Sequence, residues 1–170
     1  EINFDAIEDK TFSEQRFSVL ARSSSGLGIT FTTSDSEVII SESNVSMQKP
    51  GRVTISASQG GNENFLPAQS ISRTFCINPL KPTISVLFDE PNVLISSSTT
   101  GNQWFLNNQT IPGATGPKYS ATEPGIYTVQ ISHENCVSEK SHIQVLIITS
   151  TEPTLDSEIV PYPNPFRERV

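Results

Sequence analysis

The chain is poor in the residues from which many functional sites are built. Its 170 residues include two cysteines, two histidines, one methionine and one tryptophan, and charged residues make up only 17%. The cysteines, Cys76 and Cys136, are too few for a dense disulfide scaffold or a closed four-ligand zinc site. They can form one bridge or remain thiols. Because a free cysteine packs as a small hydrophobic residue, we expect two buried thiols.

Basic residues and long hydrophobic runs are also scarce. Eleven bases stand against 18 acids, which gives a net charge of −7. A nucleic-acid-binding protein needs a basic stripe to displace counterions, so we expect no nucleic-acid partner. The longest purely aliphatic run covers residues 145–148. A membrane helix needs about 20 apolar residues, so we expect no membrane insertion.

Small polar residues and short alternating segments dominate instead. The chain has 24 Ser, 16 Thr and 11 Asn residues. Alternating apolar and polar residues, with β-branched and aromatic side chains, are typical of half-buried strands, and turn signals separate these segments. The sequence therefore predicts an all-β sandwich or barrel protein, with strands near 17–22, 29–33, 37–41, 52–58, 71–77, 83–87, 92–97, 102–106, 118–121, 126–132 and 141–146.

Proline-rich segments divide the chain. Pro79 and Pro82 lie within four residues, which stops a strand and stiffens the connection. We expect one unit over 1–79 and another over 80–149, with few contacts across the boundary. A Ser/Thr-rich linker at 150–158 and an extended tail at 159–170 follow. The segments that begin Pro50-Gly51 and Pro124-Gly125 share the form Pro-Gly-x-apolar-Thr-apolar, so each is expected to open the penultimate strand of its unit.

No catalytic, metal-binding or cofactor-binding motif stands out. His133 and His142 are nine residues apart near several acids, but polar residues on loop tips and wet strand faces are usually solvated. No serine lies in a Gly-x-Ser-x-Gly pattern. The oxygen-rich segment 33–37 lacks the spacing and glycine of an EF-hand, which favours a polar turn over a calcium site. We therefore expect no enzyme activity, no cofactor and no metal.

The aromatic residues of the second unit allow two interpretations. Trp104, Phe105, Tyr119 and Tyr127 could form a platform for sugar rings or pack a core. Successive strand residues face opposite sides. We expect Trp104 in the core, so that Phe105 points outward or toward a neighbouring domain. Phe105 is therefore the candidate binding residue.

Both units resemble bacterial Ig-like modules. In the first, the resemblance covers Ile7 to Phe12, Phe17 to Ala21, Ile29 to Ser34 and Thr54 to Ala68. The second resembles an Ig-like module of secreted proteins of the Bacteroidetes type, through Gly101 to Asn107, Ile111 to Thr115 and Gly125 to Val129. The resemblance implies two tandem Ig-like β-sandwiches.

The second resemblance assigns roles to two aromatic residues. It puts Trp104 at the core position of Ig folds and Tyr127 where a tyrosine corner would lie. An Ig disulfide would place its second cysteine two residues after that tyrosine, where Val129 stands. The usual inter-sheet bridge is therefore not expected.

The tail carries a third resemblance. The motif Tyr162, Pro163, Asn164, Pro165 and Phe166 follows the Ser/Thr-rich linker and resembles the opening of the C-terminal sorting domain of type IX secretion substrates. That family's domain continues for several more strands, so we expect a truncated sorting domain here. The resemblance implies a partner, the secretion machinery, and a secreted or outer cell-surface location.

Together these features predict a non-catalytic role. We expect spacer or adhesion modules of a secreted, cell-surface bacterial protein exported by type IX secretion, with a surface polysaccharide or another protein as a further partner. The alternative is a carbohydrate-binding accessory region of a secreted glycoside hydrolase. Aromatic residues around Phe105 would serve the second role, and a stiff proline linker between sandwiches would serve the first.

Overall fold

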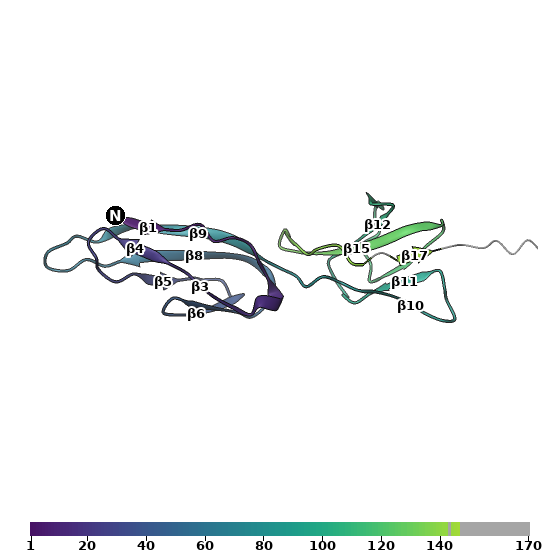
Figure 1. Ribbon diagram of the computed structural model, residues 1–170, viewed down its shortest axis with the longest axis horizontal. Coiled ribbons are helices and arrows are strands. Elements are labelled where there is room, and N and C mark those ends of the chain that lie inside the picture. The colour runs from purple at the N-terminus through teal and green to yellow at the C-terminus, as the bar shows by residue number, and fades with distance from the viewer. Residues whose placement is uncertain (143, 147–170) are drawn as a thin grey trace, which may run out of the picture.

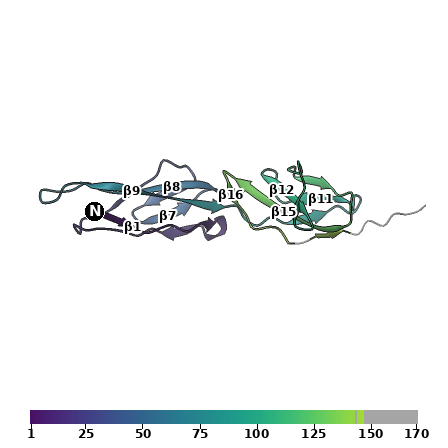
Figure 2. The same ribbon diagram turned by 90° about the horizontal axis from the view of Figure 1, so that it is seen from above.

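The computed structural model describes residues 1–142 and 144–146, and these residues form two β-sandwiches. The prediction of an all-β fold is confirmed, because the described secondary structure is strand apart from one short 3-10 turn, η1 (Phe12–Glu14). The two sandwiches lie end to end and give an elongated molecule (Figures 1 and 2). The N-terminal strand β1 (Ile2–Phe4) lies toward the outer end of the first sandwich.

The first sandwich is built around two long strands. Its larger sheet has the order β2-β9-β8-β5, and its smaller sheet has the order β3-β7-β6. A separate ribbon pairs β1 with β4. The bounds of these strands are β2 (Lys10–Thr11), β3 (Arg16–Ser18), β4 (Ala21–Ser23), β5 (Thr30–Thr32), β6 (Val38–Ser41), β7 (Asn44–Met47), β8 (Gly51–Gln59) and β9 (Ala68–Asn78).

The second sandwich has smaller sheets. One has the order β10-β11-β14, and the other places β15 between β12 and the pair β16 and β17. Its strands are β10 (Ile84–Val86), β11 (Val93–Ser96), β12 (Asn102–Leu106), β13 (Gln109–Thr110), β14 (Lys118–Ser120), β15 (Gly125–His133), β16 (Cys136–Val137) and β17 (Gln144–Leu146).

Strand periodicity accounts for the first core. Along β8 every second residue is buried, and Val53, Ile55 and Ala57 are fully covered. These side chains face the core, while the alternate Thr54 and Ser56 hydrogen-bond across to Thr74 and Ser72 on β9. Such cross-strand pairs fix the register of the β8–β9 hairpin.

Trp104 and Tyr127 organise the second core, as predicted. Trp104 is fully buried, and its indole N–H donates to the Gly116 carbonyl at 2.9 Å. Tyr127 is also fully buried, and its hydroxyl donates to the Glu123 carbonyl at 2.8 Å. This bond, four residues back along the chain, is a tyrosine corner. Burial raises the pKa of Tyr127 above its usual value of 10.0.

The repeated Pro-Gly segments play the same part in both sandwiches. β8 begins at Gly51 and β15 begins at Gly125, and both strands are nine residues long. β8 is followed by the last strand of its sandwich, β9. β15 is followed by the short edge strands β16 and β17, which both pair with it. The predicted penultimate-strand role therefore holds for β8 but not for β15, which two short strands follow.

Candidate functional site: the joint between the sandwiches

Phe105 does not offer the open surface that was expected. It lies on the opposite face of β12 from Trp104, as alternation requires, but it is only 8% exposed. The Lys140 ammonium lies 3.8 Å from the centre of its ring and donates to the Asn108 side-chain oxygen at 2.6 Å. The lysine thus covers the outer face of Phe105 in a cation–π contact. The ring of this candidate binding residue points outward but is not open to solvent.

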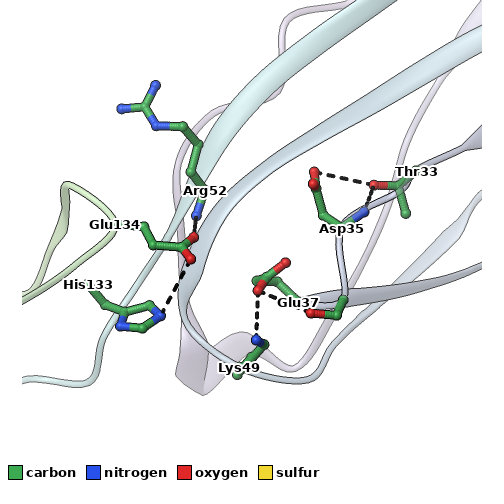
Figure 3. A network of polar contacts seen from close by, with 8 residues as sticks. Thr33, Asp35, Glu37, Lys49, Arg52, His133 and Glu134 are labelled. Carbon is green, nitrogen blue, oxygen red and sulfur yellow. Dashed lines mark hydrogen bonds and ion pairs between the residues drawn. The ribbon is translucent and has the colours of Figure 1, made fainter.

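The oxygen-rich segment 33–37 is a polar turn. The Thr33 hydroxyl accepts from the Asp35 N–H at 3.1 Å and donates to the Thr54 carbonyl at 2.8 Å. The Asp35 carboxylate accepts from the Thr54 N–H at 2.6 Å. Thr33 and Asp35 thus both bond to Thr54 on β8, and Figure 3 shows the bonds between Thr33 and Asp35 themselves. Within the described residues, no three His, Cys, Asp or Glu side chains gather as a metal site.

A tight turn of the second sandwich reaches the first. β15 and β16 are joined by Glu134 and Asn135, both with left-handed backbone angles (φ 49° and 64°). Two consecutive left-handed residues make a type I′ turn, which matches the twist of the flanking strands. This β15–β16 turn points back toward the first sandwich (Figures 1 and 2). It brings Glu134 and Cys136 to the boundary between the sandwiches.

A disulfide joins the two sandwiches at this point. Cys76, on β9, is bonded to Cys136, on β16, with a Cα–Cα distance of 5.3 Å. Cys136 is fully buried, and the Cys76 N–H donates to the Asp9 carboxylate at 2.7 Å. The expectation of two buried thiols is wrong. Each cysteine sits at the end of its sandwich that abuts the other, so the pair bridges the sandwiches rather than the sheets within one.

Hydrogen bonds reinforce the disulfide on both sides. The Arg52 N–H donates to Oε2 of Glu134 at 3.2 Å, and the Val137 N–H donates to Oδ1 of Asn78 at 3.2 Å. Figure 3 shows the first of these bonds. The contacts across residues 78–82 are thus few in number, but one of them is covalent. We call Gly51–Arg52, Cys76–Asn78 and Glu134–Val137 the joint.

Gly51 allows the sandwiches to approach. Its backbone is buried, and its φ of 154° lies where L side chains rarely occur. A Cβ there would lie 2.8 Å from Cγ of Glu37 and 2.9 Å from Oε2 of Glu134. A larger residue would strain the backbone here and would require the Glu37 and Glu134 side chains to shift.

An ion pair stands beside the joint. Lys49 lies 2.8 Å from the nearly buried Glu37 carboxylate (Figure 3). Its hydrogen bond holds the pKa of Glu37 below the usual value of 4.5. Conversely, the hydrogen bond that Lys49 donates to Glu37 raises the pKa of Lys49, and the Glu134 charge adds a smaller effect. The lysine thus lies in the field of carboxylates from both sandwiches.

Two hollows flank the connecting segment. One has a volume of about 610 Å³ and is lined by Phe12, Lys49, Pro50, Pro79, Leu80, Lys81, Thr83, Ser97, Ser98, Thr100, Ile131, Ser132 and His133. The other, of about 500 Å³, lies over residues 78–81 and 137–139 as well as Thr11 and Ser13. The lining of the larger hollow combines apolar side chains with hydroxyl groups.

The two histidines are exposed to solvent. His133 is half exposed beside Glu134, 4.0 Å away, and His142 is exposed, as the solvated interpretation predicted. The tail residues Tyr162, Pro163, Asn164, Pro165 and Phe166 lie outside the described residues, as do 150–158. Among the described residues, no helix has the length and apolar character needed to cross a membrane.

Comparisons with known proteins yield structural likenesses only. No family model matches the chain, and no curated protein matches it either. Thirteen chains of solved structures do match. One is described as the BSP domain of a biofilm-associated protein, with 19% identity and a TM-score of 0.31, over 89% of this chain and 30% of that one. Another comprises the four N-terminal Ig domains of Dscam1, with 11% identity and a TM-score of 0.33, over 85% of this chain and 44% of that one. The chain thus spans less than half of either structure, and at such low identities and scores neither informs its function.

Proposed function

We propose that this chain is a non-catalytic spacer of a secreted bacterial surface protein, in which the joint holds two Ig-like sandwiches as one rod. The observation that carries the proposal is the Cys76–Cys136 bridge between the sandwiches. A proline-containing connection is only semi-rigid by itself, and small polar interfaces between domains rarely prevent the remaining motion. A covalent bond at the abutting ends, with two hydrogen bonds beside it, removes that freedom.

Export to an oxidising compartment agrees with the bridge. Disulfides persist outside the cytosol and are rare within it. The Tyr162–Phe166 resemblance supplies a route, type IX secretion, with the secretion machinery as partner. A reporter carrying residues 159–170 tests that route in a type IX-competent host. Surface delivery should occur in that host and not in an otherwise matched host that lacks the type IX machinery. Equal delivery in both hosts, or in neither, contradicts the assignment.

Rigidity is the property to measure for the spacer. Small-angle X-ray scattering on the parent should give a single extended shape, and replacing both Cys76 and Cys136 by Ser should lower its maximum dimension and broaden its distance distribution. Lys81→Ala is the control, because it removes only an exposed 3.7 Å ion pair with Glu139. A parent that already samples many interdomain angles contradicts the spacer function.

The larger hollow of the joint favours a second function, carbohydrate binding as an accessory region of a glycoside hydrolase. Its lining combines Phe12, Pro50 and Pro79 with several hydroxyl groups, and this mixed character is typical of ligand sites at domain interfaces. A glycan array, followed by titration with any polysaccharide that binds, tests this function. Ser97→Ala together with His133→Ala should abolish binding, whereas Phe105→Ala should not. If the chain binds no surface polysaccharide, the carbohydrate-binding function is contradicted and only the spacer function remains.

A further inference from the structure

The larger hollow of the joint is lined by charged residues of one sign. Among the described residues, its lining includes Lys49, Lys81 and His133 but no aspartate or glutamate. The chain as a whole is acidic, with 18 acids, 11 bases and a net charge of −7. A cleft whose charged groups are all basic attracts anions and raises their local concentration. The hollow therefore differs in charge from the rest of the molecule.

The three basic residues come from both sides of the joint. Lys49 belongs to the first sandwich, Lys81 to the connecting segment, and His133 to the end of β15 in the second sandwich. The Glu134 carboxylate lies 4.0 Å from His133, and its charge also contributes to the raised pKa of Lys49 (Figure 3). Because the Cys76–Cys136 bridge joins the sandwiches, the backbones that carry these residues keep one arrangement.

The carboxylate partners of these residues leave them accessible to a ligand. The side chain of Glu37 is only 9% exposed, whereas that of its partner Lys49 is 51% exposed. The positive group of this pair is thus the one that solvent reaches. The ion pairs of Lys81 and His133 are long, 3.7 and 4.0 Å, and both involve exposed side chains. Such pairs contribute little energy, so a ligand can replace them at small cost.

The uncharged part of the lining favours a sugar over a simple anion. Apolar side chains on one hand and hydroxyl groups on the other can contact the C–H faces and the hydroxyls of sugar rings. Thr83, Thr100 and Ser132 are exposed, so their hydroxyl groups are available to a ligand. The volume of about 610 Å³ lies within the range of about 300–1,000 Å³ that is usual for ligand sites.

We propose that this hollow binds an acidic polysaccharide, whose sugar rings carry carboxylate groups. The inference rests on the carbohydrate-binding function proposed above and names the class of glycan. Lys49, Lys81 and His133 donate charge-assisted or neutral hydrogen bonds to the carboxylates, and the Ser and Thr hydroxyls bond to the sugar hydroxyls. Because the lysines are partly exposed, salt should weaken the binding.

Titration calorimetry tests the acidic class on the full chain. The probes are oligomers of galacturonate, alginate and hyaluronan, each before and after methyl esterification, which removes the charge and keeps the sugar. At least one acid should bind, at least tenfold more tightly than its ester at 50 mM NaCl, and the difference should shrink at 500 mM NaCl. An ester that binds as tightly as its acid overturns the proposal, and so does a lack of binding by all three acids. Carbohydrate binding itself survives either result if the glycan array yields a neutral ligand.

Charge reversal at one residue tests the location of the site. Lys81→Glu should weaken binding of the acid at least tenfold and leave binding of the ester unchanged. Arg22→Glu makes the same change of charge at an exposed position on β4, outside the joint, and should change neither affinity more than twofold. Unchanged thermal melting confirms that both variants fold. Unchanged acid binding by Lys81→Glu, or an equal loss in both variants, overturns the proposal.

Poly-glutamate separates an acidic glycan from an acidic peptide. It carries carboxylates at close spacing but has no sugar rings or hydroxyl groups. It should bind at least tenfold more weakly than the acidic oligomer that binds best. Equal binding overturns the proposal, because it indicates a site that recognises charge alone.

Discussion

The two sandwiches solve the same packing problem with different resources. Among the described residues, the first core unites eleven buried side chains, mostly aliphatic and spread over five strands and a loop, whereas the second has five. In the second, Trp104 stacks near Tyr119, with ring centres 6.0 Å apart, and Tyr119 packs against Tyr127 at 5.8 Å. The first sandwich distributes its stability, and the second concentrates it on three aromatic rings.

This difference gives the joint a second role. A sandwich of some 70 residues buries a small share of its surface and is marginally stable. The first sandwich has the β8–β9 hairpin, with strands of nine and eleven residues, as a frame. The second has shorter strands and is bonded through Cys136 to the end of that frame. We therefore expect the second sandwich to depend on the joint more than the first.

Trp104→Ala should have the largest effect, and it should destabilise the second sandwich but not the first. Removing a buried tryptophan costs about 3–5 kcal/mol, comparable to the whole stability of a small domain. The second sandwich should unfold while the first keeps dispersed amide signals in a ¹H–¹⁵N NMR spectrum. Phe105→Ala is the control, since it lies on the outer face beneath Lys140 and should cost less. If Trp104→Ala melts like the parent but loses glycan binding, the aromatic-platform interpretation replaces the core one.

Replacing both Cys76 and Cys136 by Ser should have the next largest effect. Removing a native disulfide from a small domain typically costs about 2–5 kcal/mol. The loop closed by this bridge spans 60 residues, nearly all of them in the second sandwich. The melting transition of the second sandwich should therefore fall, while that of the first stays within a few degrees, as calorimetry can resolve. An equal fall in both transitions means that the sandwiches unfold as one unit.

The sequence predicts features that depend on local alternation and on turn residues. The long strands, the buried Trp104 and the equivalent starts of β8 and β15 follow from period-two patterns and from Pro-Gly segments. Several short elements were missed. Strands β1 and β7 were not predicted, and β7 depends on a tight turn in which Glu42 has a φ of 56°. Glutamate is not a common residue in such a conformation, so the sequence of the segment between β6 and β7 gives little indication of a turn.

The joint depends on how the two sandwiches meet, which no local pattern encodes. Each unit has one cysteine, and the usual Ig bridge is absent. This pattern allowed two alternatives, a pair of free thiols or a disulfide between the units. The position of Cys76 just before the boundary was the only hint. The covering of Phe105 was not predicted for a similar reason. Alternation correctly turned its side chain away from Trp104, but the lysine that covers it lies 35 residues later in an irregular segment.

The smallest expected effect concerns charge at the base of the first sandwich. The pKa of Glu37 is lowered chiefly by its hydrogen bond with Lys49. A lowered pKa means that the unfolded chain binds the proton more readily than the folded one. The carboxylate therefore adds stability above its usual value of 4.5, and this stability is lost as the pH falls through the lower folded value. The raised pKa of Lys49 sets the other limit, since its contribution is lost only as the pH rises above 10.5.

Glu37→Gln tests this contribution and its location. Between pH 5 and 9 the first sandwich of the variant should melt below that of the parent, because the amide cannot form the ion pair. As the pH falls from 5 toward 3, the difference should shrink, since the parent loses the same charge. Glu139→Gln is the matched control, because Glu139 is 82% exposed and its ion pair with Lys81 is long. That variant should melt like the parent at every pH, as exposed pairs contribute little. A pH-independent difference for Glu37→Gln would mean that the side chain acts through packing rather than charge. A shift confined to the second transition would mean that its charge acts through Glu134 across the joint.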